Sequence, residues 1–169
     1  MNRGFTLIEL VAALALLAIL AASIASRYAD LQQEARSVQL QAMADAAGAG
    51  ARLIHAQAAL EGLIEGRQNI DLDGTVVQLH SGYPRGHWNN AVRYMITLDN
   101  VRFTNATTVC ADTWCGRGNQ RNVPGYGSTP GRGAKIWPRG YRWSDRCGVF
   151  YINHEDGRDP EVGVDELGC

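Results

Sequence analysis

Residues 5–26 read FTLIELVAALALLAILAASIAS, a stretch of 22 residues with a single charged side chain, Glu9. At a rise of about 1.5 Å per residue, a helix of this length covers the roughly 30 Å hydrocarbon core of a bilayer. A carboxylate inside such a span is costly, which makes Glu9 a candidate functional residue; the alternative is a simple signal anchor with an incidental Glu. The rest of the sequence is polar, so we expect one membrane span.

The composition sets broad limits on the remainder. A chain of 169 residues with 20% charged residues and a net charge of −1 suits one modest domain plus an appendage. The near-neutral balance gives no overall electrostatic case for a nucleic-acid or acidic partner. The sequence has no serine with the spacing of a nucleophile elbow and no glycine-rich segment with the spacing of a phosphate-binding loop, so the chain is not expected to be an enzyme.

A helix is predicted to continue from Arg27 to about Leu60, because helix-forming residues dominate there and the first proline is Pro84. Gly48 and Gly50 weaken this pattern and would allow either a bend or a close approach of another element. Apolar residues at steps of three or four predict the stripe that docks the helix onto the C-terminal region: Tyr28, Leu31, Ala35, Val38, Ala42, Ala46, Ala49, Leu53, Ala56 and Leu60.

After the helix, turn residues divide the chain into short segments. Strands are predicted at 75–79, 92–98, 101–109, 142–143 and 147–153, with a turn at Asp99-Asn100. The glycine-rich segment 116–140 is predicted to be mostly loop. A helix followed by antiparallel strands predicts an α+β fold, in which a long N-terminal helix packs on a C-terminal antiparallel sheet.

The segment Gly4-Phe5-Thr6-Leu7-Ile8-Glu9-Leu10 resembles the processing site of type IV prepilins and type II secretion pseudopilins. The resemblance implies cleavage by the prepilin peptidase between Gly4 and Phe5, and N-methylation of Phe5. It also implies that Glu9 pairs with the Phe5 amine of an adjacent subunit during assembly, which relieves two buried charges together.

The same resemblance implies the domain organisation and the partners. The expected parts are a leader (1–4), a transmembrane and filament-core helix (5–26), an amphipathic helix (27–62) and a globular β domain (63–169). Arg3 keeps the N-terminus cytoplasmic by the positive-inside rule, so the subunit waits in the inner membrane before it enters an extracellular pilus or a periplasmic pseudopilus. The implied partners are further copies of the chain, the peptidase/methyltransferase, and the inner-membrane assembly platform with its ATPase.

A narrower resemblance, to the mannose-sensitive haemagglutinin (MSHA) class of type IV pilins, is carried by residues 28–36, 53–58, 71–74 and 82–84. It implies a structural subunit of a pilus used for surface attachment. The alternatives are a type II secretion pseudopilin and a minor pilin that binds DNA or a surface ligand. Where such pilins usually carry a glycine and a proline that let the helix melt, this chain has Ala18 and Ser26.

Four cysteines lie outside the span, and an even number in an exported domain favours two disulfides with three possible connectivities. The favoured pairs are Cys110–Cys115, which closes a tight loop, and Cys147–Cys169, which ties the C-terminal tail to a strand. A zinc site is the competing interpretation, but it lacks a second close pair of ligands, and the four histidines are scattered.

Acidic residues crowd the C-terminal tail: Glu155, Asp156, Asp159, Glu161, Asp165 and Glu166. Their hard oxygen atoms suit Ca²⁺, and the similarity to pseudopilins with calcium in C-terminal loops keeps that ion possible, but a solvated acidic face is favoured. The Asp71-x-Asp73-Gly74 segment resembles the opening of a calcium loop, but it lacks the later ligands and is interpreted as a turn. No cofactor is otherwise expected.

The segment 137–143 interleaves cations with aromatic residues: Trp137, Arg139, Tyr141, Arg142 and Trp143. These residue types suit stacking on nucleic acid. Arginines that stack on aromatic rings or pair with the acidic tail are the favoured interpretation, so a nucleic-acid partner is not expected.

Overall fold

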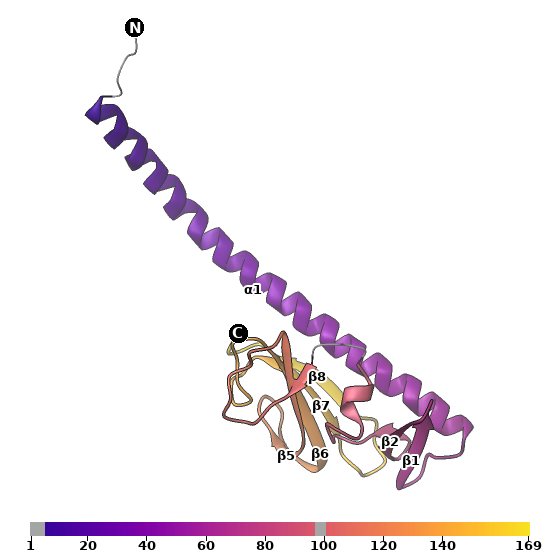
Figure 1. Ribbon diagram of the computed structural model, residues 1–169. Coiled ribbons are helices and arrows are strands. Elements are labelled where there is room, and N and C mark those ends of the chain that lie inside the picture. The colour runs from indigo at the N-terminus through magenta and orange to yellow at the C-terminus, as the bar shows by residue number, and fades with distance from the viewer. Residues whose placement is uncertain (1–5, 97–100) are drawn as a thin grey trace. The chain divides into compact units, whose positions relative to one another are not determined.

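The computed structural model describes residues 6–96 and 101–169, apart from the side chains of Ser26 and Ala29 (Figure 1). The chain divides into two compact units, Met1–Val38 and Gln39–Cys169. Helix α1, Leu7–Leu60, passes from the first unit into the second, and all the strands lie in the second unit. A long N-terminal helix followed by packed β-sheets is the α+β arrangement that the order of elements predicted, and this prediction is confirmed.

Helix α1 is continuous through Ala18 and residue 26 and ends where a glycine reverses the backbone. Gly62 adopts a left-handed conformation with φ of 72°. The Leu63 N–H then donates to the Ala58 carbonyl at 2.8 Å, and the Gly62 N–H donates to the Ala59 carbonyl at 3.2 Å. These two bonds form a Schellman motif, which satisfies the last carbonyls of the helix and turns the chain towards the first strand.

The face of α1 that is buried in the C-terminal unit differs from the predicted stripe. Its buried residues are Leu40, Met43, Ala44, Ala47, Ala51, Ile54 and Ala58. The predicted stripe lies on the other side, where Leu53 is 72% exposed and Leu60 is 89% exposed. Alanines occur at so many positions between residues 42 and 59 that two different faces show the same apolar period. Close packing selects between them, because a Cβ on Gly50 would overlap the backbone carbonyl of Met95.

Three short strands form an antiparallel sheet directly after the helix: β1 (Arg67–Leu72), β2 (Thr75–His80) and β3 (Tyr83–Pro84). The predicted strand at 75–79 is confirmed as β2. Asp73 and Gly74 both have positive φ at the β1–β2 turn, and the Gly74 N–H donates to Asp71 Oδ1 at 2.6 Å. This geometry is a hairpin turn, as the sequence predicted for this segment.

A second sheet has five strands in sequential order: β4 (Val101–Phe103), β5 (Trp114–Val123), β6 (Gly127–Pro138), β7 (Gly148–Asn153) and β8 (Glu161–Asp165). All its neighbouring pairs are antiparallel except β4 and β5, which are parallel. The sheet is therefore mixed, whereas an antiparallel one was expected. The predicted strand at 147–153 is confirmed as β7.

The prediction that residues 116–140 are mostly loop is wrong, because they contain most of the β5–β6 hairpin. Gly125 and Gly127 have positive φ at the turn between the two strands, but several glycines inside the strands are needed for close packing. A Cβ on Gly116 would overlap the ring of Trp88, and a Cβ on Gly118 would press on the backbone of Trp88. A Cβ on Gly133 would collide with the side chains of Ile152 and Val123.

Three other strand predictions need correction. Residues 92–94 form a short 3₁₀ helix, η1 (Val92–Tyr94), and the turn expected at Asp99-Asn100 lies outside the described residues. The strand expected at 101–109 ends at Phe103, and residues 142–143 lie in an irregular segment. Conversely, residues 161–165 of the acidic tail form β8. This strand was not predicted, because the tail contains many charged residues.

Candidate functional site

Gly4 and Phe5, the predicted cleavage and methylation residues, lie outside the described residues. Immediately after them, Thr6 and Glu9 form a reciprocal cap at the start of α1. The Thr6 backbone N–H and hydroxyl donate to Glu9 Oε2 at 2.9 and 2.7 Å, and the Glu9 N–H donates to Thr6 Oγ1 at 3.4 Å. This is a capping box, and its Thr-x-x-Glu spacing is a signal that the sequence analysis missed.

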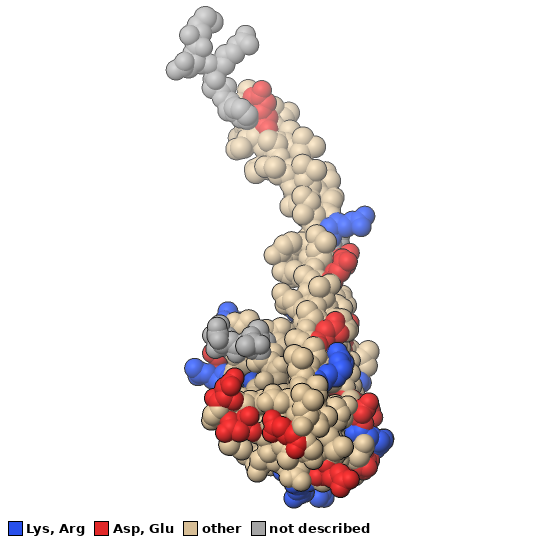
Figure 2. Space-filling view, turned by 90° about the vertical axis from the view of Figure 1, so that its right-hand side faces the viewer, with Lys and Arg blue, Asp and Glu red and all other residues tan. Residues whose placement is uncertain are grey.

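The helix that follows this cap presents apolar side chains to its surroundings. Leu7, Ile8 and Ile24 are all at least 64% exposed, and the segment is one candidate membrane span with a mean hydropathy of 2.6. Figure 2 shows groups of charged side chains spread over the C-terminal unit, whereas the first part of α1 is almost entirely free of them in this view. Transfer of each large apolar side chain out of water is favourable by about 1.5–3 kcal/mol of free energy, so this segment needs a membrane or other apolar helices around it.

The C-terminal part of α1 also has an exposed apolar face. Leu53 and Leu60 project away from the core together with Ala56. The face was predicted to dock within the subunit; only its edge lies near the sheet, where Ala42 and Ala46 line a hollow with Trp114. An exposed apolar face of this kind is typical of a surface that is buried by another molecule.

Two disulfides tie down the loops at one end of the five-stranded sheet: Cys110–Cys115 and Cys147–Cys169. The tail is also held by backbone and side-chain contacts. The Gly168 N–H donates to the Arg146 carbonyl at 2.6 Å, and the Tyr141 hydroxyl donates to the Cys169 carbonyl at 3.0 Å. The C-terminal residues are therefore an integral part of this unit.

The acidic tail is largely engaged by basic side chains. Glu155 contacts Arg85 at 2.8 Å and Arg67 at 3.2 Å, and Asp165 contacts Arg146 at 3.1 Å. Burial would raise the pKa of Glu155, but the hydrogen bonds and charges of the two arginines outweigh it and hold the pKa below its ordinary value. Within residues 6–96 and 101–169, no three His, Cys, Asp or Glu side chains are grouped so that they could hold a metal ion.

The aromatic residues of segment 137–143 belong to the core. Trp137 is fully buried, Trp143 is 9% exposed, and their rings meet edge to face with centroids 5.9 Å apart. The Arg117 guanidinium lies 5.8 Å from the centroid of a Trp143 ring. Since the tryptophan faces are occupied, they provide no platform for nucleic-acid bases, and arginine stacking on an aromatic ring is observed in their place.

Lys135 of β6 is a buried cation that the sequence analysis did not identify. Its ammonium donates to the backbone carbonyls of Trp143 and Asp145, and so fixes the loop that precedes Cys147. Burial lowers the pKa of Lys135 to about 8, against the smaller opposing effect of the charges on Asp165 and Asp145. The residue positions this loop rather than a ligand.

Comparison with known proteins gives one match, confined to the N-terminus. Residues 1–25 match the family model described as the prokaryotic N-terminal methylation motif. This signature supports the type IV pilin and pseudopilin superfamily, and it points to a structural subunit rather than an enzyme. It also implies processing by a prepilin peptidase and assembly into filaments. No curated protein and no solved structure matches the chain.

Proposed function

We propose that the chain is a structural subunit of an MSHA-like type IV pilus that serves surface attachment. The observation that carries the proposal is an exposed apolar helix that begins at the Thr6–Glu9 cap and whose first part, up to residue 25, matches the N-terminal methylation motif. The similarity of residues 28–36, 53–58, 71–74 and 82–84 to MSHA pilins supports the narrower class.

Assembly follows from the charges at the start of the helix. Cleavage after Gly4 frees the amine of Phe5, one residue before Thr6. The Thr6 hydrogen bonds hold the Glu9 carboxylate at this end of the helix. In a filament, the amine of an adjacent subunit then offsets the charge of Glu9, which would otherwise be buried alone among apolar helices.

The exposed apolar face of the C-terminal part of α1 supports the same function. In an isolated subunit, Leu53 and Leu60 stand in water, and association of helices removes them from it. The two parts of α1 therefore supply apolar surfaces for contacts between subunits, and the disulfide-tied domain remains available for contact with other surfaces.

The test compares Glu9→Ala with Glu34→Ala, a matched change of an exposed glutamate of α1 outside the apolar span. Filaments sheared from the cell surface and the membrane pool are quantified by immunoblot, and mass spectrometry reports the N-terminus. We expect Glu9→Ala to retain cleavage before Phe5 and normal membrane levels but to lose most surface filament, whereas Glu34→Ala assembles normally.

Normal filament yield from Glu9→Ala would refute the pairing mechanism. An uncleaved chain in the wild type would refute the processing site. Filaments confined to the periplasm at natural expression levels would contradict a pilus and favour a secretion pseudopilus.

A further inference from the structure

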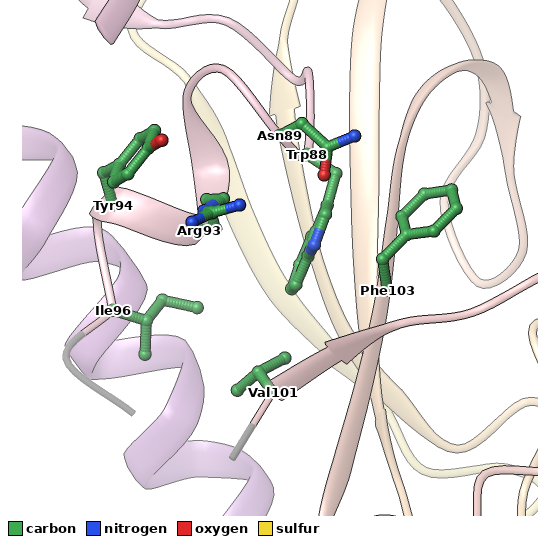
Figure 3. A pocket seen from close by; sticks show the side chains of 7 residues that line it. All are labelled: Trp88, Asn89, Arg93, Tyr94, Ile96, Val101 and Phe103. Carbon is green, nitrogen blue, oxygen red and sulfur yellow. The ribbon is translucent and has the colours of Figure 1, made fainter. Parts of the chain in front are cut away.

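Each sheet of the C-terminal unit ends in a strand with an open outer edge. In the three-stranded sheet this strand is β1, and in the five-stranded sheet β8 and β4 lie at the two edges (Figure 1). In the part of the chain that the structure describes, β4 spans only Val101–Phe103 and lies beside the hollow next to η1 (Figure 3). β1 has six residues and β8 has five, so these two offer the longer edges.

The outer edge of β8 is not protected against a further strand. Among the described residues, its backbone groups form hydrogen bonds only with β7, in a register without a bulge. The strand contains no proline and no lysine, and its terminal carboxylates are engaged, Glu161 with His154 and Asp165 with Arg146. Proteins usually block open edges with such features, so β8 is suited to the addition of an extended chain.

A groove of about 430 Å³ lies along this edge, between β8 and α1. Its α1 wall runs from Gln41 to Arg52, which is about 16 Å at a rise of about 1.5 Å per residue. Five residues of extended chain cover the same length at about 3.3 Å per residue. The groove therefore has the length of one short strand. The residues that line it are Gln41, Ala44, Asp45, Gly48, Arg52, Pro160, Val162, Gly163 and Val164.

The groove carries one negative and one positive charge at different heights. Asp45 accepts a hydrogen bond from the Gln41 amide at 3.1 Å, and neither Asp45 nor Arg52 forms an ion pair among the described residues. The Tyr83 hydroxyl donates to Asp159 at 3.1 Å and lies close enough to Arg52 to be affected by its charge. Arg52 therefore lies beside the start of β8, and Asp45, two helical turns earlier, lies towards its end.

The exposed face of β1 carries the same two kinds of charge. Arg67, Asn69 and Asp71 are all exposed and lie on one face of the strand, because side chains alternate between faces. The Arg67 side chain is 68% exposed although it contacts Glu155 at 3.2 Å. Asp71 Oδ1 accepts from the Gly74 N–H. Both charged groups thus remain accessible to another molecule.

We propose that β1 of one copy of the chain pairs antiparallel with β8 of a neighbouring copy, in the groove beside α1. This contact rests on the proposed function, because the neighbour is then another subunit of the filament. The contact joins two different edges, so each added copy leaves one of its own edges free for the next. Such a heterologous contact extends into a helical filament when its rotation does not close a ring.

The charges favour the antiparallel direction. An antiparallel β1 strand brings Arg67 of one copy to Asp45 of the other, and Asp71 to Arg52. A parallel strand would bring like charges together, which is unfavourable. The separations are similar, since Arg67 and Asp71 are about 13 Å apart along a strand and Asp45 and Arg52 about 10.5 Å apart along a helix. The long arginine side chains cover this difference.

The same arrangement fixes which residues face each other. Val162 packs against the core that contains α1, so its side chain lies on the α1 side of β8. For Arg67 and Asp71 to reach α1 of the neighbour, Asn69 between them must lie on this side too, opposite Val162. Gln68 then points to the other face. Opposite residues of antiparallel strands have Cα atoms about 4.5–5.5 Å apart, a distance that a disulfide spans.

The test expresses two full-length variants in the same cells, one with Asn69→Cys and one with Val162→Cys. Because no described cysteine is free, a new disulfide can form only between two different subunits. Sheared filaments are oxidised and analysed by immunoblot without reductant. The matched control replaces Asn69→Cys by Gln68→Cys, one residue away on the opposite face, and each variant is also expressed alone.

We expect a dimer from Asn69→Cys with Val162→Cys, at least about 10-fold more abundant than from the Gln68→Cys pair. Filaments without this dimer, equal dimer from both pairs, or dimer from Val162→Cys alone would overturn the proposal. Filaments that form normally without the dimer would refute this contact alone, whereas a wild type without any filament would refute the proposed function as well.

A charge exchange provides a second measurement that needs no cysteine. Asp71→Arg and Arg52→Asp should each lower the yield of filament several-fold, because each places like charges at the contact. The double variant restores an opposite pair and should recover to within about twofold of the wild type. A double variant as deficient as the worse single variant would contradict the pairing of Asp71 with Arg52. Membrane levels of each variant, measured by immunoblot, verify that the subunit is folded and retained.

Discussion

Gly48 and Gly50 of α1 provide a sharp test of the packing described above, because sequence rules treat them alike and the structure does not. Both lie in the helix, and replacing either by alanine removes the conformational penalty of a helical glycine. Their surroundings differ. A Cβ on Gly48 would touch only the side chain of Arg52, at 3.5 Å, whereas a Cβ on Gly50 would overlap the backbone of Met95.

The two substitutions are expected to change the free energy of unfolding in opposite directions. At Gly48 the new methyl group is accommodated, so Gly48→Ala should raise the free energy of unfolding by about 0.5–1 kcal/mol. At Gly50 the colliding atoms are backbone atoms after η1, which cannot rotate away as a side chain can. Overpacking of this kind costs about 1–3 kcal/mol or more, and it exceeds the helix-propensity gain. Gly50→Ala should therefore lower stability by at least about 1 kcal/mol.

The measurement is denaturant unfolding of the detergent-solubilised chain, followed by near-UV circular dichroism. Trp88, Trp137 and Trp143 are buried in the C-terminal unit, so their signal reports the packing in question. The two variants share the same helix, the same substitution and the same detergent, so effects on the apolar span cancel between them.

If Gly50→Ala stabilised the chain as much as Gly48→Ala, the close approach of α1 to Met95 would be refuted. The choice of buried face would then also fail, because Gly50 borders the face that contains Ala47, Ala51 and Ile54. A double variant in which both glycines are alanine should show roughly additive changes, since the two positions have no packing neighbour in common.

Two further predictions concern the disulfides and the buried lysine. By loop-closure entropy, replacing both Cys147 and Cys169 by alanine should lower the free energy of unfolding by about 3.4 kcal/mol, because the two residues are 22 positions apart. The same change at Cys110 and Cys115, which are 5 positions apart, should lower it by about 2 kcal/mol. Denaturant unfolding of the two double variants measures both losses, and a larger loss for Cys110 and Cys115 would contradict the argument. Lys135 loses its proton near pH 8 when folded but near 10.5 when unfolded, so unfolding takes up a proton between these values and stability rises with pH there. Relative to Lys135→Met, the wild type should gain up to about 3 kcal/mol across this window in urea melts, and a difference independent of pH would show that the lysine is not buried as described.

The sequence by itself determined the features of this protein that depend on neighbouring residues. The apolar stretch after Thr6 predicts a membrane-length helix because its composition is uniform over about 20 residues, and no folding partner is needed to recognise it. The order of helix and strands predicts the α+β class, because each element is recognised from its own stretch of sequence. The turn at Asp73-Gly74 and the strand after it were predicted because turn residues act within four positions.

Only the tertiary structure decided which surfaces meet. The buried face of α1 could not be chosen from a segment with alanine on every side, since the choice depends on the Met95 carbonyl that approaches Gly50. The glycines of β5 and β6 resembled loop residues because their purpose, room for the Trp88 ring at Gly116, is set by a distant part of the chain. Long-range packing, which local patterns do not encode, made these decisions.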